Sequence, residues 1–169
     1  KRDRDVTIDQ MSQSAGLRPM LSSVALDMAK DRPLLGHGYG QYNVEAGPYH
    51  LNHDSGLPLQ KVKSYVQHNV FLSYLTELGL IGLGLTLIIL SCFVFNAYEV
   101  LQNSGLPGSY RLFGLAALLL TLAMIINGLF HDVSLIVMVG SIFYFANGLV
   151  YSIRDQAEVE AKVIEGPPV

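Results

Sequence analysis

Long apolar stretches without any charge fill the second part of this chain, and they constrain its fold more than any other feature. Leu78–Phe95 contains no charged residue and is rich in Leu and Ile. At a rise of about 1.5 Å per residue, such a run crosses most of a bilayer core of roughly 30 Å. Two more uncharged runs follow at Leu112–Phe130 and Val133–Ile153. The sequence therefore predicts an all-α membrane protein, a polytopic helical bundle fragment. Its three transmembrane helices are expected at about residues 70–96, 111–130 and 133–153.

Composition and charge agree with this class. The mean hydropathy is +0.35 and half of the residues are hydrophobic, which is high for a soluble domain. Residues 1–69 hold eight Lys or Arg against seven Asp or Glu, so this polar part has no strongly basic face and we expect no nucleic-acid partner. Cys92 is the only cysteine, which excludes an intrachain disulfide or a cysteine-based zinc site.

The polar segment 1–69 is predicted to form a large exterior loop. Residues 1–15 carry charges of both signs and are expected to be disordered. A short amphipathic helix is predicted at 19–30, with Pro19 at its first position and its end before Pro33. The chain starts without Met, and we expect it to be a piece of a longer membrane protein.

The positive-inside rule gives the orientation. The connector before the second apolar run holds Arg111, and the tail holds Arg154 and Lys162, whereas the second connector, His131-Asp132, has no Lys or Arg. Basic connectors favour the cytoplasm, so the tail, residues 154–169, is predicted to be cytoplasmic and is expected to be disordered. The segment 1–69 then lies on the other, exterior side.

Catalytic chemistry is predicted where the polar segment meets the first long helix. Asn69 can cap a helix that starts at Val70, because its side-chain oxygen can accept a hydrogen bond from a free backbone N–H. This cap places His68 just outside a helix N-terminus, which favours an anion. Histidine is suited to take a proton from a hydroxyl near neutral pH. The alternative is a histidine at the interface without a role.

Two further side chains are candidates for the same site. Arg18 can grip a phosphate or diphosphate through two parallel hydrogen bonds, or it is a solvated surface arginine. Glu77 lies nine residues after His68, half a turn out of phase in one continuous helix, so the two can act together only if His68 lies off the helix. Otherwise Glu77 pairs with a cation on a missing helix.

Weaker motifs have plainer interpretations. Gly36-x-Gly38-x-Gly40 does not match the dinucleotide-binding pattern and is read as turn glycines. His50-x-x-His53-Asp54 has suitable ligand types, but no helix fixes its spacing, and we expect neither a metal nor a cofactor. Asp132 caps a helix or lines a site with His131. Small residues in the apolar runs, such as Gly79, Gly84 and Gly114, are either helix contacts or ordinary membrane-helix glycines.

Taken in order, the motifs resemble a known family. Arg18, an apolar helix, Pro33-Leu34-Leu35-Gly36-His37-Gly38, a variable loop, and His68-Asn69 through Glu77-Leu78-Gly79-Leu80-Ile81-Gly82 are similar to the O-antigen ligase/polymerase family over roughly residues 16–150. The chain departs from it in two ways: the position four residues after Arg18, often aromatic, is Ser22, and the usually small residue between Gly36 and Gly38 is His37.

The resemblance implies a glycosyltransferase of the bacterial inner membrane. Its donor is a glycan on undecaprenyl diphosphate, and its acceptor is a hydroxyl of a glycolipid, a glycan or a protein, with membrane lipids around it. His68 is implied to activate the acceptor hydroxyl and Arg18 to bind the donor diphosphate. Asn69 and Glu77 are predicted, from their positions in the sequence, to be substrate-binding residues of the same site. A non-catalytic subunit of a polysaccharide assembly or export system is the alternative, because such a subunit would need neither Arg18 nor His68.

Overall fold

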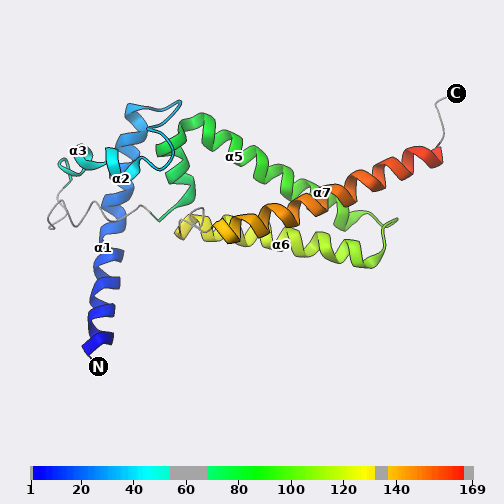
Figure 1. Cartoon of the computed structure of the whole chain (residues 1–169), viewed down its shortest axis with the longest axis horizontal. Helices are drawn as coiled ribbons and strands as arrows, with labels where there is room; N and C mark the ends of the chain where they lie inside the picture. The colour runs from blue at the N-terminus through cyan, green and yellow to red at the C-terminus, as the bar shows by residue number, and fades with distance from the viewer. Residues whose placement is uncertain (1, 54–67, 132–136, 166–169) are drawn as a thin grey trace. The chain divides into compact units, whose positions relative to one another are not determined.

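All regular secondary structure in the described residues is helical (Figure 1). The computed structural model describes residues 2–53, 68–131 and 137–165. The helices are α1 (Arg2–Asp31), α2 (Tyr42–Glu45), α3 (Gly47–His50), α5 (Val70–Gln102), α6 (Gly108–Phe130) and α7 (Val137–Glu165). The all-α prediction is therefore confirmed for these ranges. The residues form two compact units, Lys1–Leu85 with Gly128–Asp132 and Thr86–Asn127 with Val133–Val169, and each is described by itself.

Helix α1 is longer than the sequence suggested. It includes Pro19 in its interior, so the predicted start at this proline and the predicted disorder of residues 1–15 are wrong for residues 2–15. A proline removes one helical hydrogen bond, but Leu17 and Leu21 are buried on either side of it, and their packing offsets that loss. The predicted end before Pro33 is confirmed, because α1 stops at Asp31.

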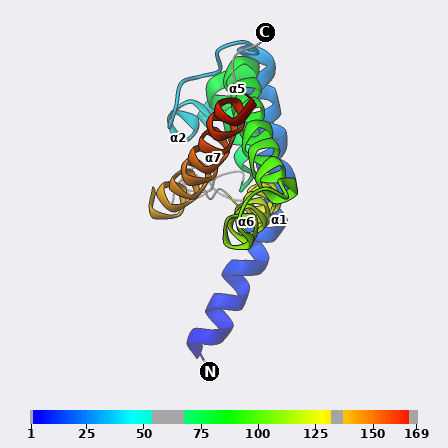
Figure 2. The same ribbon diagram turned by 90° about the vertical axis from the view of Figure 1, so that its right-hand side faces the viewer.

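The core of the first unit forms around the second half of α1. Its buried residues are Val24, Ala25, Met28, Tyr42 and Ala46, with Tyr49 and Leu72 packed against them. These side chains belong to α1, α2, α3 and the start of α5. The Thr76 hydroxyl donates to the Ala25 carbonyl at 3.1 Å, which joins α1 directly to α5. The first part of α5 runs beside α1 in both ribbon views (Figures 1 and 2).

Helix α5 is interrupted at Gly79. This residue has φ 68° and ψ −167°, a conformation outside the helical region. As one rod, 33 residues would measure about 50 Å, much more than the roughly 30 Å of a bilayer core. The break leaves an apolar part, Leu80–Gln102, that has as many residues as α6, which has 23. The predicted continuation of one helix from Val70 is thus corrected to two helical parts.

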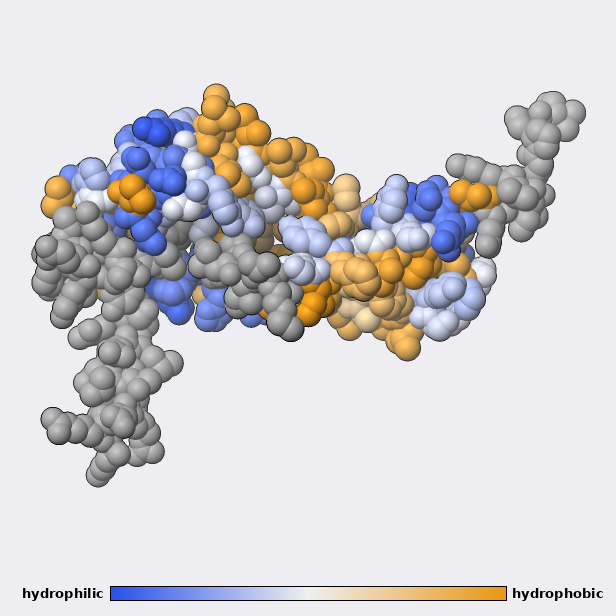
Figure 3. Space-filling view, in the orientation of Figure 1, coloured by the Kyte–Doolittle hydropathy of each residue, from blue (hydrophilic) through white to orange (hydrophobic). Residues whose placement is uncertain are grey.

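Two helices in the described ranges, α5 and α6, are long and apolar enough to cross a membrane. Large apolar side chains are exposed along α5, among them Leu85, Leu87 and Ile88. Figure 3 shows the corresponding hydrophobic surface along this helix in orange. The predicted third span corresponds to the first part of α7 and its preceding residues. The described part of α7 begins at Val137, and the third span stays a prediction.

The second unit packs the last turns of α5 against α6 and the middle of α7. Ala97, Val100, Ala117 and Val150 form its buried cluster. Gly114 allows the close approach of α6 to α5, because a Cβ built on it would lie 3.0 Å from a methyl group of Val100. This glycine is a helix contact, one of the two alternatives that the sequence left open.

Helix α7 continues well past the last apolar run. It ends at Glu165, so the expected disorder is wrong for residues 154–165. Arg154 explains part of this order. It forms an ion pair with Glu158 at 2.9 Å, one helical turn ahead, and a second ion pair with Glu99 of α5. The extension is therefore held both along the helix and against a neighbouring one.

Candidate functional site

The junction between His68 and Val70 folds as the sequence predicted. Helix α5 begins at Val70, and the Asn69 side-chain oxygen accepts a hydrogen bond from the Leu72 N–H at 3.0 Å. Asn69 is therefore the N-cap. His68 lies off the helix, half-buried, with φ 51°. This left-handed conformation is uncommon for residues other than glycine, and here it turns the chain into the helix start.

Asn69 also reaches a second helix end. Its side-chain nitrogen donates to the Leu129 carbonyl in the last turn of α6 at 3.1 Å. Carbonyl groups in the last turn of a helix lack partners within the helix, so one amide side chain serves an N-terminus and a C-terminus together. Gly128 lies close to the start of α5, since a Cβ on it would be 3.4 Å from the Phe71 ring. His68 is thus adjacent to a residue fixed at two points.

Arg18 lies on α1 with its side chain exposed. Among the residues that the structure describes, none forms an ion pair with it. It is in the helix interior rather than before the helix start, which corrects the prediction made from Pro19. The guanidinium group is therefore available on the α1 surface.

The helix rise places Arg18 level with Asn69. The contact between Ala25 of α1 and Thr76 of α5 gives a common reference level for the two helices. Arg18 lies seven residues before Ala25, and Asn69, the N-cap of α5, lies seven residues before Thr76. Seven residues correspond to roughly 10 Å and to about two turns, so each residue returns to the same face. The two helical parts run in the same direction in Figure 1. The structure thus brings Arg18 and the His68-Asn69 junction to one level of neighbouring helices.

Glu77 has partners that the sequence did not indicate. Its buried carboxylate accepts hydrogen bonds from the Gly40 N–H at 2.8 Å and from the Tyr42 N–H at 3.1 Å. Both carboxylate oxygens therefore hold the loop that leads into α2, which is neither of the two expected roles. No local pattern could show this, because the partners lie 35 and 37 residues away in the sequence.

The two most specific sequence motifs are joined by their backbones. His37 N–H donates to the Thr76 carbonyl at 3.0 Å, and Gly38 N–H to the Glu77 carbonyl at 2.8 Å. In return, Leu80 N–H donates to the Pro33 carbonyl at 2.8 Å. The break at Gly79 frees these groups, and the turn from Pro33 to Gly38 satisfies them. The motifs thus form one interlocked unit, described below as the turn-break interlock.

Glycine is required twice in the turn-break interlock. Gly36 and Gly79 both have φ 68°. A Cβ on Gly36 would overlap the Glu77 carbonyl, and a Cβ on Gly79 would overlap the Leu34 carbonyl. Gly38 and Gly40 also have positive φ, which agrees with the interpretation as turn glycines.

His37, the departure from the family pattern, is buried beneath this turn. Its Nε2 lies 2.9 Å from the Met28 carbonyl near the end of α1, and its ring meets the Tyr49 ring edge-on. The Tyr49 hydroxyl donates to the Asp31 carboxylate at 2.6 Å, and this hydrogen bond raises the pKa of Tyr49 to about 12. His37 therefore fills a packing position between α1, α3 and α5.

The weaker metal motif does not assemble in the described residues. His53 Nε2 lies 3.0 Å from the Asp27 carboxylate, which Lys30 also contacts at 2.8 Å. Hydrogen bonds from Lys30 and His53 lower the pKa of Asp27. His50 is buried in α3, whereas Asp54 and Asp132 lie outside the described residues. Within the described ranges, no group of three His, Cys, Asp or Glu side chains could hold a metal ion.

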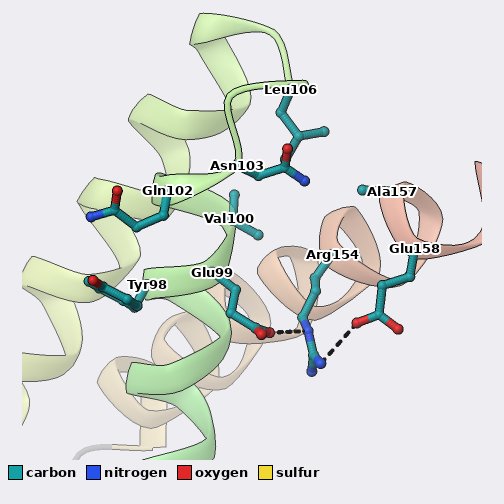
Figure 4. A pocket seen from close by; sticks show the side chains of 9 residues that line it. All are labelled: Tyr98, Glu99, Val100, Gln102, Asn103, Leu106, Arg154, Ala157 and Glu158. Atoms are coloured by element: carbon teal, nitrogen blue, oxygen red, sulfur yellow. Dashed lines mark ion pairs between the residues drawn. The ribbon is translucent and has the colours of Figure 1, made fainter. Parts of the chain in front are cut away.

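A cavity of about 410 Å³ lies in the second unit, away from these residues in the sequence. Figure 4 shows it between the end of α5 and α7, with Arg154 between Glu99 and Glu158. Arg154 also donates to Asn96 at 2.7 Å. Neither Arg18, Asn69 nor Glu77 lines this cavity. Its arginine is already paired with two carboxylates, so we attribute to it a structural role in joining α5 to α7.

Comparison with protein families gives a match to the first part of the chain. The family described as O-antigen ligase matches residues 2–87, which include α1, the turn-break interlock and the His68-Asn69 junction. No curated protein and no solved structure matched the chain.

Proposed function

The chain belongs to the O-antigen ligase family, and from this premise we propose that it transfers or polymerises a glycan from an undecaprenyl-diphosphate donor onto an acceptor hydroxyl. The reaction is proposed to occur at the periplasmic face of the bacterial inner membrane. The observation that supports the proposal most is the common level of Arg18 and the His68-Asn69 junction on adjacent helices. The family match covers both positions.

His68 is proposed to act as the general base. It would take the proton from the acceptor hydroxyl, whose oxygen then forms a bond to the anomeric carbon of the donor sugar. The bond from that carbon to the diphosphate oxygen breaks, and undecaprenyl diphosphate leaves with the bonding electron pair. Direct displacement of this kind inverts the configuration at the anomeric carbon. His68 lies two residues before the first residue of α5 rather than within the helix.

Arg18 is proposed to bind the donor diphosphate. Its guanidinium group is exposed and offers two parallel N–H groups to phosphate oxygens. As the diphosphate leaves, negative charge grows on it, and a fixed cation stabilises that charge in the transition state. The N-terminus of α5, which lies at the same level, also favours an anion through its free N–H groups.

Asn69 and Glu77 enter the proposal as residues that fix the site. Asn69 uses both ends of its amide on helix termini, and Glu77 uses both oxygens on the loop before α2. We therefore propose that Asn69 and Glu77, predicted to bind substrate, instead hold the backbone of the site in place.

Replacement of the two principal residues tests the proposal. Glycan transfer in cells is compared between wild type, His68→Ala and Arg18→Ala at matched membrane levels. We expect activity to fall by about 10²–10⁴-fold without the base and by about 10²–10³-fold without the cation, with lipid-linked donor accumulating. Arg18→Lys should recover only part of the activity, because lysine keeps the charge but loses the planar pair of donors.

Matched controls separate chemistry from folding. His53→Ala and Arg32→Ala remove the same side-chain types from the same unit, outside the proposed site, and should keep activity close to wild type. If His68→Ala and Arg18→Ala transfer glycan as well as these controls, the transferase proposal is wrong. The protein would then be a non-catalytic subunit of a polysaccharide assembly system.

A further inference from the structure

Four large apolar side chains are exposed around the break in α5. They are Leu34 (61% exposed), Leu35 (74%), Leu80 (54%) and Ile81 (51%), and together they are called the break patch. Two backbone hydrogen bonds hold the patch together: Leu80 N–H to the Pro33 carbonyl at 2.8 Å and Ile81 N–H to the Leu34 carbonyl at 3.3 Å. The turn and the new helix start therefore present one continuous apolar surface.

This surface continues into the membrane-crossing part of α5. Leu80 and Ile81 are the first residues after the break, and Leu85, Leu87 and Ile88 extend the exposed apolar surface along the same helix. Figure 3 shows orange surface along α5, beside the blue surface over the end of α1. A compact soluble surface rarely leaves so many large apolar side chains open, so lipid is the occupant that fits.

The backbone at the break suits a non-aqueous surrounding. A helix start has free N–H groups that water normally satisfies, and in lipid each unsatisfied group costs several kcal/mol. Here carbonyl groups of the turn accept the N–H groups of Leu80 and Ile81. The turn thus satisfies two N–H groups of the helix start without water.

The N-terminal end of the first part of α5 is fixed against the end of α6. Asn69 is bonded to Leu129 in the last turn of α6, and α6 has as many residues as the part of α5 after the break. With both α5 and α6 crossing a bilayer, the connector 103–107 lies on one side of it, and the chain at Leu80 and at Phe130 lies on the other side. Residues 70–78 therefore connect two points at one membrane boundary.

We propose that the break patch is embedded among lipid acyl chains and that residues 70–78 lie along the membrane surface. The side chains of Leu34 and Leu35 insert among the acyl chains beside the transmembrane part of α5. This placement goes beyond the proposed function and requires that both α5 and α6 cross a membrane. It differs from the expectation of one transmembrane helix at about residues 70–96.

Tryptophan fluorescence tests this placement, since the chain has no Trp of its own. Leu35→Trp is reconstituted into phosphatidylcholine vesicles with brominated acyl chains, which quench tryptophan by contact, and into the same vesicles without bromine. Leu85→Trp, 57% exposed in the apolar part of α5, gives the reference for lipid contact. Leu51→Trp, 75% exposed at the end of α3, is the control with matched exposure.

We expect the brominated lipid to quench Leu35→Trp at least about half as strongly as Leu85→Trp. Quenching of this strength is expected for a side chain that enters the outer, roughly 5–10 Å deep part of a leaflet. Leu51→Trp should be quenched little. Iodide in the water should quench Leu51→Trp more strongly than Leu35→Trp. Equal quenching of Leu35→Trp and Leu51→Trp by the brominated lipid would overturn the proposal. The side chains at 35 and 51 are exposed, so neither replacement disturbs a packed core, and helix content by circular dichroism verifies this.

Discussion

Replacement of Gly79 by alanine should destabilise the first unit strongly. With φ 68° and ψ −167°, Gly79 occupies a region that is essentially restricted to glycine, which costs another residue about 1–3 kcal/mol. The added Cβ would also overlap the backbone carbonyl of Leu34, which has no side-chain freedom to yield. The turn must then move away from α5.

The size of the effect follows from the bonds that this movement breaks. Leu80 N–H and Ile81 N–H lose their carbonyl partners, at about 1–3 kcal/mol for each buried group left unsatisfied. Together with the conformational cost, the loss is roughly 3–9 kcal/mol. For a chain of this length, that loss lowers the thermal midpoint by about 6–36 °C.

Gly84→Ala is the matched control on the same helix. A Cβ on Gly84 meets nothing within 4 Å, and alanine is favoured over glycine in a helix by about 1 kcal/mol. This variant should match or slightly exceed wild type. The assay is the fraction of protein that stays monodisperse after heating in detergent micelles. The midpoint is the temperature at which half of the protein is no longer monodisperse. If the midpoints of Gly79→Ala and Gly84→Ala differ by less than about 3 °C, the reasoning on the turn-break interlock is refuted.

Three further predictions concern side chains around the site. Glu77→Gln keeps the shape but replaces one acceptor by a donor, so we expect a loss of about 1–3 kcal/mol in the same heating assay, and an unchanged midpoint would contradict the role in holding the loop. Asn69→Asp keeps the N-cap but loses the donor to Leu129, so kcat should fall more than KM rises, and equal activity would show that the second bond is dispensable. The lowered pKa of Asp27 means that its contribution to stability is present above its ordinary value of 3.8 and is lost as pH falls through the lower folded value. Asp27→Asn should therefore reduce stability at neutral pH but not at a pH below the lowered folded pKa, and a difference that persists in strong acid would contradict the sign.

Several features were predictable because short-range chemistry decides them. An Asn before an apolar helix start predicts an N-cap, and the Asn69 bond to Leu72 confirms it. A proline two residues after Asp31 ends α1 as expected. Residue order alone also indicated the family, since the motifs around Gly36 and Gly79 are contiguous strings.

Other features could not be predicted because their partners lie far away in the sequence. The sequence left Gly79 as either a helix contact or an ordinary membrane-helix glycine, but the turn at Leu34 occupies the space that any Cβ would need. Glu77 was expected to act with His68 or with a missing cation, whereas its partners are two backbone N–H groups across the interlock. The extension of α7 depends on Arg154 meeting Glu99 of another helix.

The sequence by itself determined the helical class, the apolar spans, the cap at Asn69 and the resemblance to O-antigen ligases, because periodicity, composition and capping act within a few residues. Only the tertiary structure decided where α5 breaks, what Glu77 holds and that Arg18 is level with His68. These depend on backbone groups that a helix leaves free at its ends, and such groups are satisfied by whichever distant segment packs against them.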